Sequence, residues 1–223
     1  MQLTPEDHGR VSGAIKAAEA TTSGEIFCIL TNERHRYLEW IFALSALLAF
    51  TLPFFLTTVG FGPGDWTALL GVWQAEGLSE RQTIEAYAAV QAFVFLATTL
   101  ALWWSPLAQR FAPRFMRQDR VHDLALKQFM AKGIHLTAGR TGVLIFVSAE
   151  DHIVEVVADE GIFAKVPNDH WGDTAEKLLA GLRRDDPAQG FVDAIGHIGG
   201  VLAQHFPPTP DNPNEIDDHL IIV

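Results

Sequence analysis

The sequence predicts an α/β protein in which helices cover both faces of a mixed sheet and a two-helix transmembrane hairpin interrupts the chain. Residues 40–59 and 86–104 contain no charged side chain. As helices, each is long enough to cross a hydrocarbon core about 30 Å thick. On both sides of this hairpin, helical spacing of apolar residues alternates with short apolar runs that are typical of buried strands.

Residues 1–37 form the N-terminal αβ part of the predicted domain. The segment TPED, which starts at Thr4, places a capping hydroxyl, a proline and two acids at a helix start. Gly24 ends this helix, and the apolar run EIFCILT at residues 25–31 predicts a strand. A unit this small cannot bury enough apolar surface to fold alone, so we expect it to dock on the C-terminal part.

The hairpin is expected to consist of transmembrane helices at residues 38–59 and 86–107, joined by an external loop at residues 60–85. Arginines flank the pair on the side of the two chain ends: Arg34, Arg36, Arg110, Arg114, Arg117 and Arg120. The connecting loop is mainly acidic. Because positive flanks stay on the cytoplasmic side, we expect both termini in the cytoplasm and no cleaved signal peptide.

The main part of the domain is expected at residues 108–206. A helical pattern near residues 118–133 precedes the strand GVLIFVS, which a polar turn connects to the strand IVEVVAD. Two further amphipathic helices begin at Asn168 or Asp169 and at Pro187. Residues 207–223 form an acidic, proline-rich tail that ends in LIIV, and LIIV pairs either with this domain or with another protein.

Composition excludes some classes of function. The net charge of -11 disfavours nucleic acid as a partner. The single cysteine, Cys28, lies inside a predicted strand and is expected to be a buried, inert thiol. None of the nine histidines has a spacing typical of two ligands on one helix face, so most are expected at the surface or half-buried.

Three carboxylates are candidate metal ligands. Asp159 and Glu160 follow a predicted strand, and ligands of α/β sheets gather beyond strand ends. Asp169 at a helix start could face the same space, where carboxylate oxygens would hold a hard divalent cation such as Ca²⁺. The alternative interpretation is that Asp159 and Glu160 cap a turn and Asp169 caps a helix.

Arg140 is the candidate phosphate-binding residue. It precedes the strand that starts at Gly142, where its guanidinium could clamp a phosphate beside Asp159, the other candidate catalytic residue. It could equally be a solvated charge in a turn, and Lys165 has the same two interpretations. Glu25 either lies near Arg140 or is simply exposed.

Four segments, taken in order, resemble the TPM domain, also called the TPM phosphatase family. They are TSGEIFCIL, GRTGVLIFVSAEDHIVEVVADEGI, KVPNDHW and DPAQGFVDAIGHIGGVL. The likeness covers most of residues 1–37 and 118–205, and the family's Gly-Val-Leu strand, short glycine loop and helix-starting acid correspond to Gly142 to Leu144, Gly161 and Asp169. The inserted hairpin resembles the bacterial branch of the family, which implies the inner membrane rather than the exported location of better-known relatives.

The resemblance implies an αβα sandwich with about four strands, and it implies an acidic cleft that binds calcium in some relatives. It also implies two classes of function. One is a membrane-anchored accessory or scaffold protein that assembles, stabilises or repairs a membrane protein complex. The other is a divalent-metal-dependent, acid-phosphatase-like hydrolase. The expected partners are the lipid bilayer and a membrane protein, and whether the chain is an enzyme stays open.

Overall fold

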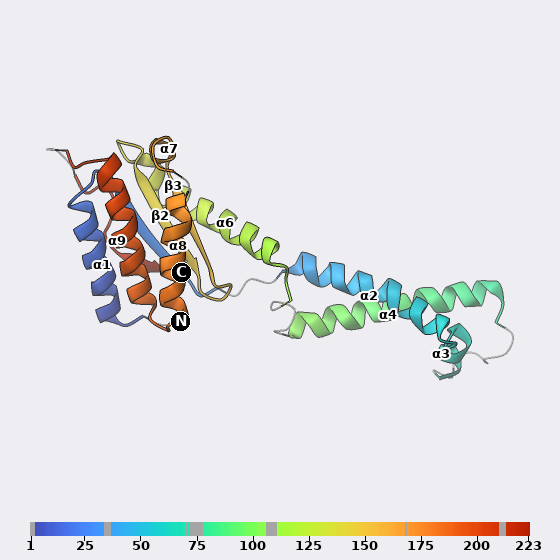
Figure 1. Cartoon of the computed structure of the whole chain (residues 1–223). Coiled ribbons are helices and arrows are strands. Elements are labelled where there is room, and N and C mark those ends of the chain that lie inside the picture. The colour runs from blue at the N-terminus through green and yellow to red at the C-terminus, as the bar shows by residue number, and fades with distance from the viewer. Residues whose placement is uncertain are drawn as a thin grey trace. The chain divides into compact units, whose positions relative to one another are not determined.

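A computed structural model describes residues 3–33, 37–69, 71, 78–105, 111–167, 169–209 and 213–223, without the side chain of Asp169 (Figure 1). The chain forms two compact units. Residues 1–34 and 114–223 make up the first unit, and residues 35–113 make up the second.

The first unit is built on a mixed four-stranded sheet, as the sequence predicts. Its strands are β1 (Glu25–Thr31), β2 (Gly142–Ser148), β3 (Ile153–Ala158) and β4 (Leu220–Ile222), in the order β3-β2-β1-β4. β1 pairs in parallel with both β2 and β4, and β3 pairs antiparallel with β2. The strands nearest the centre are fully buried along their length, which explains their nearly continuous apolar sequences.

The chain end LIIV pairs with its own domain. Leu220 lies opposite Cys28 and Ile222 lies opposite Leu30 in the parallel ladder. The backbone N–H of Val223 also donates to the carbonyl of Leu30, at 3.0 Å. The segment after the prolines therefore completes the sheet as an edge strand.

One face of the sheet is covered by α1 (Pro5–Glu19), α8 (Asp169–Arg183) and α9 (Pro187–His205) (Figure 1). Apolar residues of these helices and of alternate strand positions form one core: Val11, Ile15, Leu178, Phe191 and Ile195 with Ile26, Cys28, Leu30, Val143, Ile145 and Val147. Cys28 is fully buried, and burial raises the pKa of its thiol, so it is the inert core thiol that its strand predicts.

The other face is covered by α6 (Arg114–Ala131). Val121, Ala125 and Phe129 of this helix pack against the remaining strand positions, which are Phe27, Ile29, Leu144 and Phe146. The alternation of side chains along each strand thus feeds two cores, one on each face. The first unit is the three-layered α/β structure that the sequence predicts.

Local sequence explains the helix starts. Thr4 and Asp7 form a capping box at the start of α1, with Pro5 at its first position. Asp186 caps α9 by accepting a hydrogen bond from the N–H of Gln189 at 2.9 Å.

Glycine residues allow α8 and α9 to pack closely where they cross. A Cβ at Gly181 would lie 2.3 Å from the Cα of Gly190, so only glycine permits this approach.

The second unit contains α2 (Leu38–Thr58), α3 (Pro63–Leu69) and α4 (Glu80–Trp104). Within it, α2 and α4 pack against each other, and the rings of Phe42 and Phe95 stack with centroids 6.4 Å apart. The buried residues of α2 recur every four positions, at Ile41, Ser45, Ala49 and Pro53. α4 begins at Glu80, before the expected residue 86, because Ser79 and Gln82 form a capping box there.

Both α2 and α4 are long and apolar enough to cross a membrane. Most of their large apolar side chains are exposed within the unit, among them Phe50, Phe54, Phe55, Phe93, Leu96 and Leu100. A core helix of a water-soluble protein would bury such side chains. The two helices therefore have the surface expected of a hairpin in lipid.

Candidate functional site

Two of the predicted site residues, Arg140 and Asp159, lie together. Nε of Arg140 is 3.5 Å from Oδ1 of Asp159, whose side chain is only 5% exposed. The same oxygen accepts a hydrogen bond from the N–H of Glu160 at 2.7 Å, so Asp159 caps the short helix α7 (Glu160–Phe163). Oδ2 of Asp159 is buried and has no hydrogen-bond partner among the described residues.

Arg140 is held by its backbone as well as by Asp159. It has a left-handed conformation, with φ of 52°, in the turn before β2. Its Nη1 donates to the carbonyl of His135 at 2.6 Å, so the guanidinium is engaged by a carbonyl and a carboxylate. α7 approaches this turn closely, because a Cβ at Gly161 would lie 2.6 Å from the carbonyl oxygen of Arg140.

This contact lies at the amino ends of the parallel strands. Asp159 follows β3, which runs antiparallel to β2, and the register pairs Ala158 with Val143. The parallel register pairs Glu25, the first residue of β1, with Gly142, the first residue of β2. Ligands of open α/β sheets usually bind at the carboxyl ends of the parallel strands. The contact between Arg140 and Asp159 therefore lies at the opposite end of the strands from the usual ligand site.

The other predicted residues are placed separately. The side chain of Glu160 is exposed. Asp169 starts α8, and its side chain lies outside the described residues. The ammonium of Lys165 lies 4.8 Å from the ring centroid of Phe206, a cation–π contact. Glu25 is buried rather than exposed, and it faces a different group of carboxylates.

That group forms what we call the acidic pocket, a cavity of about 400 Å³ next to the start of β1. Its lining consists of Lys16, Glu19, Ala20, Glu25, Pro208, Thr209, Asn214 and Asp218. α1 contributes Glu19, β1 contributes Glu25, and the C-terminal segment contributes Asp218. The pocket therefore combines side chains from the two ends of the chain.

Hydrogen bonds fix the carboxylates of the pocket. The N–H of Ile26 donates to Glu19 Oε1 at 2.8 Å, and the N–H of Ile216 donates to Glu25 Oε2 at 3.3 Å. Asn214 Nδ2 donates to Asp218 Oδ1 at 2.8 Å. The bond from Ile216 ties the segment before β4 to the start of β1, and the bond from Ile26 ties the end of α1 to the same strand.

Burial makes this pocket electrostatically unusual. Desolvation raises the pKa of Glu19 to about 9, and the nearby carboxyl groups of Asp218 and Glu25 add to this effect. Desolvation also raises the pKa of Glu25, with the charges of Glu215 and Asp218 adding to the effect. At pH 7 Glu19 therefore holds a proton, and a divalent cation is the kind of ligand that would replace it.

Sequence reasoning missed Glu19 and Asp218. Glu19 reads as the end of an amphipathic helix, and Asp218 lies in the segment DNPNEIDD, which lacks the spacing of an EF-hand loop. The apolar segment LIIV was the feature of the sequence that could have located these two residues. Pairing it in parallel with EIFCIL would have placed the residues before β4 beside those before β1.

Comparisons with known proteins agree with this architecture. The sequence model of the TPM domain matches residues 110–201. The NMR structure of BA42 protein from the psychrophilic bacterium Bizionia argentinensis is similar in fold, with a TM-score of 0.59 and 20% sequence identity. That similarity covers 100% of this chain and 97% of the BA42 chain. No curated protein sequence matches. The resemblance inferred from the ordered segments is thereby confirmed.

Proposed function

We propose that this chain, whose residues 110–201 match the TPM domain, is a membrane-anchored accessory protein whose domain binds a divalent cation and a partner membrane protein. The cation, with Ca²⁺ the preferred one, occupies the acidic pocket. The observation that carries this proposal is the convergence of Glu19, Glu25 and Asp218 on one cavity. Carboxylate oxygens are the ligands that Ca²⁺ prefers.

The anchor in this proposal is the pair α2 and α4. Their outward apolar side chains would face lipid, and the four-residue spacing of Ala49 with Ser45 and Pro53 gives the narrow, small-residue contact common between helices in membranes. The flanking arginines favour an orientation in which both chain ends lie on the cytoplasmic side of a bacterial inner membrane. The TPM domain would then meet the cytoplasmic face of its partner.

An accessory role is favoured over catalysis by the state of Arg140. Its guanidinium is engaged with the carbonyl of His135 and with Asp159, so a phosphate would have to compete with both. Among the described residues, the lining of the acidic pocket includes Lys16 but no arginine, histidine or cysteine to act on a substrate. Cation binding there would stabilise the join between the C-terminal segment and β1, which is a structural rather than a chemical task.

Calcium titration of the full chain in detergent tests the cation site. We expect one Ca²⁺ per chain and the release of a proton from Glu19, so the measured binding enthalpy should differ between buffers of different ionisation enthalpy. Glu19→Gln and Asp218→Asn should each weaken binding by at least about tenfold, and Glu6→Gln, an exposed carboxylate on the same helix, should not. Equal affinity in all four proteins would contradict the proposal.

Crosslinking in native membranes tests the accessory role. A partner membrane protein should crosslink to the wild-type chain and to Glu6→Gln, and much less to Asp218→Asn or after calcium chelation. If the crosslink pattern is the same in all these samples, partner binding does not depend on the acidic pocket, which contradicts the proposal.

The second candidate function is a metal-dependent phosphatase. The contact between Arg140 and Asp159 favours it, together with the buried Oδ2 of Asp159 that lacks a partner among the described residues. In this reading Asp159, Glu160 and Asp169 hold the cation and Arg140 orients the phosphate. The cation would polarise a phosphoryl oxygen and lower the pKa of bound water.

Hydrolysis of a generic phosphate ester by the purified protein tests this candidate. The assay compares the wild type with Asp159→Asn at matched thermal stability, with and without divalent cations. Cation-dependent activity that is lost in Asp159→Asn would support the phosphatase. Equal traces from both proteins would mean contamination or no catalysis.

A further inference from the structure

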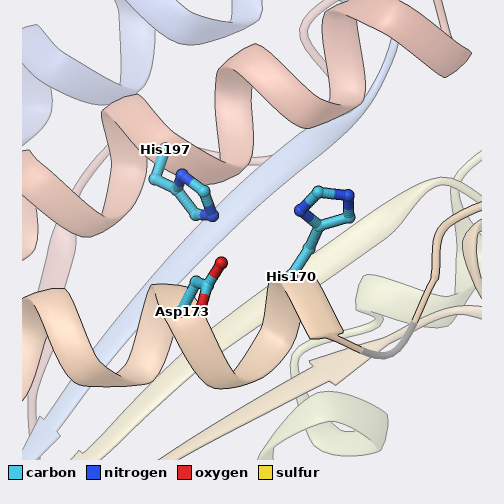
Figure 2. Close-up of side chains that lie close together, drawn as sticks. All are labelled: His170, Asp173 and His197. Carbon is cyan, nitrogen blue, oxygen red and sulfur yellow. The ribbon is translucent and has the colours of Figure 1, made fainter.

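Three side chains with metal-binding atoms meet between α8 and α9. His170 and Asp173 are three positions apart on α8, which places them on one face of that helix. His197 comes from the facing side of α9, and Figure 2 shows the three side chains pointing toward one another. One potential ligand atom from each residue lies within 4.8 Å of the other two.

Both rings carry a nitrogen that the protein leaves without a partner. Nδ1 of His170 and Nε2 of His197 are buried and accept or donate no hydrogen bond among the described residues. The ring centroids are 6.1 Å apart. Leaving one buried polar atom without a hydrogen bond costs about 1–3 kcal/mol. Two such ring nitrogens close together therefore indicate a site where a ligand would satisfy both.

We propose that His170, Asp173 and His197 bind a divalent transition metal ion of the Zn²⁺ class. Two imidazoles and one carboxylate form a ligand set that suits Zn²⁺ and disfavours Ca²⁺, which prefers oxygen. Three protein ligands leave the fourth tetrahedral position to water. Solvent reaches this position, because Asp173 is exposed and lines a surface cavity of about 270 Å³ with Glu176, Lys177, Ala180 and His197.

The ligand atoms need only a small movement to enclose the ion. In a tetrahedral zinc site, neighbouring ligand atoms lie about 3.4 Å apart. Because the ligand atoms lie within 4.8 Å of one another, side-chain rotation has to shorten the widest separation by at most about 1.4 Å.

The electrostatic surroundings favour the form of histidine that binds metal. Desolvation and the positive Lys177 lower the pKa of His197, while the nearby Asp173 opposes this effect. A neutral imidazole keeps a free lone pair at neutral pH. Lys177 also repels the incoming cation, and the charge of Asp173 offsets it.

The ion would join α8 to α9. These two helices cover the same face of the sheet, and α9 also packs against α1. A metal that binds only the folded chain stabilises it by mass action. This site shares no residue with the acidic pocket and would bind a different class of cation. Either proposal can therefore be disproved without affecting the other.

Metal titration of the untagged, full-length protein in detergent tests the proposal. Bound Co²⁺ should give visible absorption bands with the high intensity that is typical of tetrahedral coordination. Adding one equivalent of Zn²⁺ per chain should displace the Co²⁺ and abolish these bands. His197→Ala and Asp173→Asn should each weaken Zn²⁺ binding by at least about tenfold. His8→Ala, which removes a half-buried histidine from α1, should bind as the wild type does.

Two comparisons keep the result specific. Glu19→Gln should retain wild-type Zn²⁺ affinity, and excess Ca²⁺ should leave the Co²⁺ bands in place. Asp173 is exposed, so Asp173→Asn tests the site even if His197→Ala fails to fold. Absence of Zn²⁺ binding to the wild type, or equal binding to every variant, would overturn the proposal.

Discussion

Glu19 at the end of α1 and Asp218 in the segment before β4 line the same acidic pocket. Burial and the neighbouring carboxyl groups of Asp218 and Glu25 raise the pKa of Glu19 to about 9. The protonation of Glu19 therefore couples the packing of the two chain ends to pH and to cations.

The first prediction concerns pH without divalent cations. The pKa of Glu19 is raised in the folded state from 4.5 to about 9, so between these values the folded state holds a proton that the unfolded state has lost. The free energy of unfolding should therefore fall as pH rises from about 5 to about 9. Thermal unfolding across this range measures it.

Glu19→Gln checks the assignment. A glutamine keeps the oxygen that accepts the hydrogen bond of Ile26 but does not titrate, so its stability should depend much less on pH. Glu6→Gln removes an exposed carboxylate from the same helix and should keep the wild-type slope. If Glu19→Gln also keeps that slope, the proton does not reside on Glu19.

The second prediction concerns the crossing of α8 and α9. Gly181→Ala places a methyl group against the backbone of Gly190 and should reduce the free energy of unfolding by about 1–3 kcal/mol. Gly172→Ala is the matched control on α8, because its Cβ would meet no atom within 4 Å. The control should raise stability by about 0.5–1 kcal/mol through helix propensity. Similar stability of the two variants would argue against the close approach.

The third prediction concerns β4. Leu220 is buried in the core, so Leu220→Ala should destabilise the domain by about 2–4 kcal/mol. Ile222 pairs with the same strand but is 39% exposed, and Ile222→Ala should cost clearly less. Chemical denaturation of both variants makes the comparison. Wild-type stability in Leu220→Ala would mean that the chain end does not pack on β1.

The fourth prediction concerns membrane orientation. In intact cells, a membrane-impermeant maleimide should label Asp65→Cys in the connecting loop, and it should label Glu6→Cys only after permeabilisation. The native Cys28 should stay unlabelled in the folded protein, because it is fully buried and its pKa is raised. The reverse labelling pattern would invert the proposed orientation.

Local patterns predicted much of the fold. Neighbouring residues were enough to predict both strands of the β2–β3 hairpin, the cap at Thr4 and the helix start at Pro187. The structure contains all of these elements. The short helix α3 was not predicted, because its seven residues carry little periodicity. These elements show how far short-range signals extend.

The functional residues depended on contacts that no local pattern carries. Arg140 and Asp159 could be paired from sequence because both flank the hairpin of β2 and β3. Glu19 and Asp218 meet only through the parallel pairing of β1 with β4. The spacing of His170 and Asp173 was visible, but the rotation of α9 that brings in His197 is set by tertiary packing.

The position of β1 also fixes when the sheet can form during synthesis. β1 leaves the ribosome first, yet both of its neighbours, β2 and β4, are made after the two apolar helices. The nascent chain must therefore carry an unpaired, apolar strand while those helices are being translated. The last partner, Leu220–Ile222, is synthesised after the other three strands, so the sheet stays incomplete until this segment has left the ribosome, and a chain that stops before Leu220 leaves β1 with an open edge.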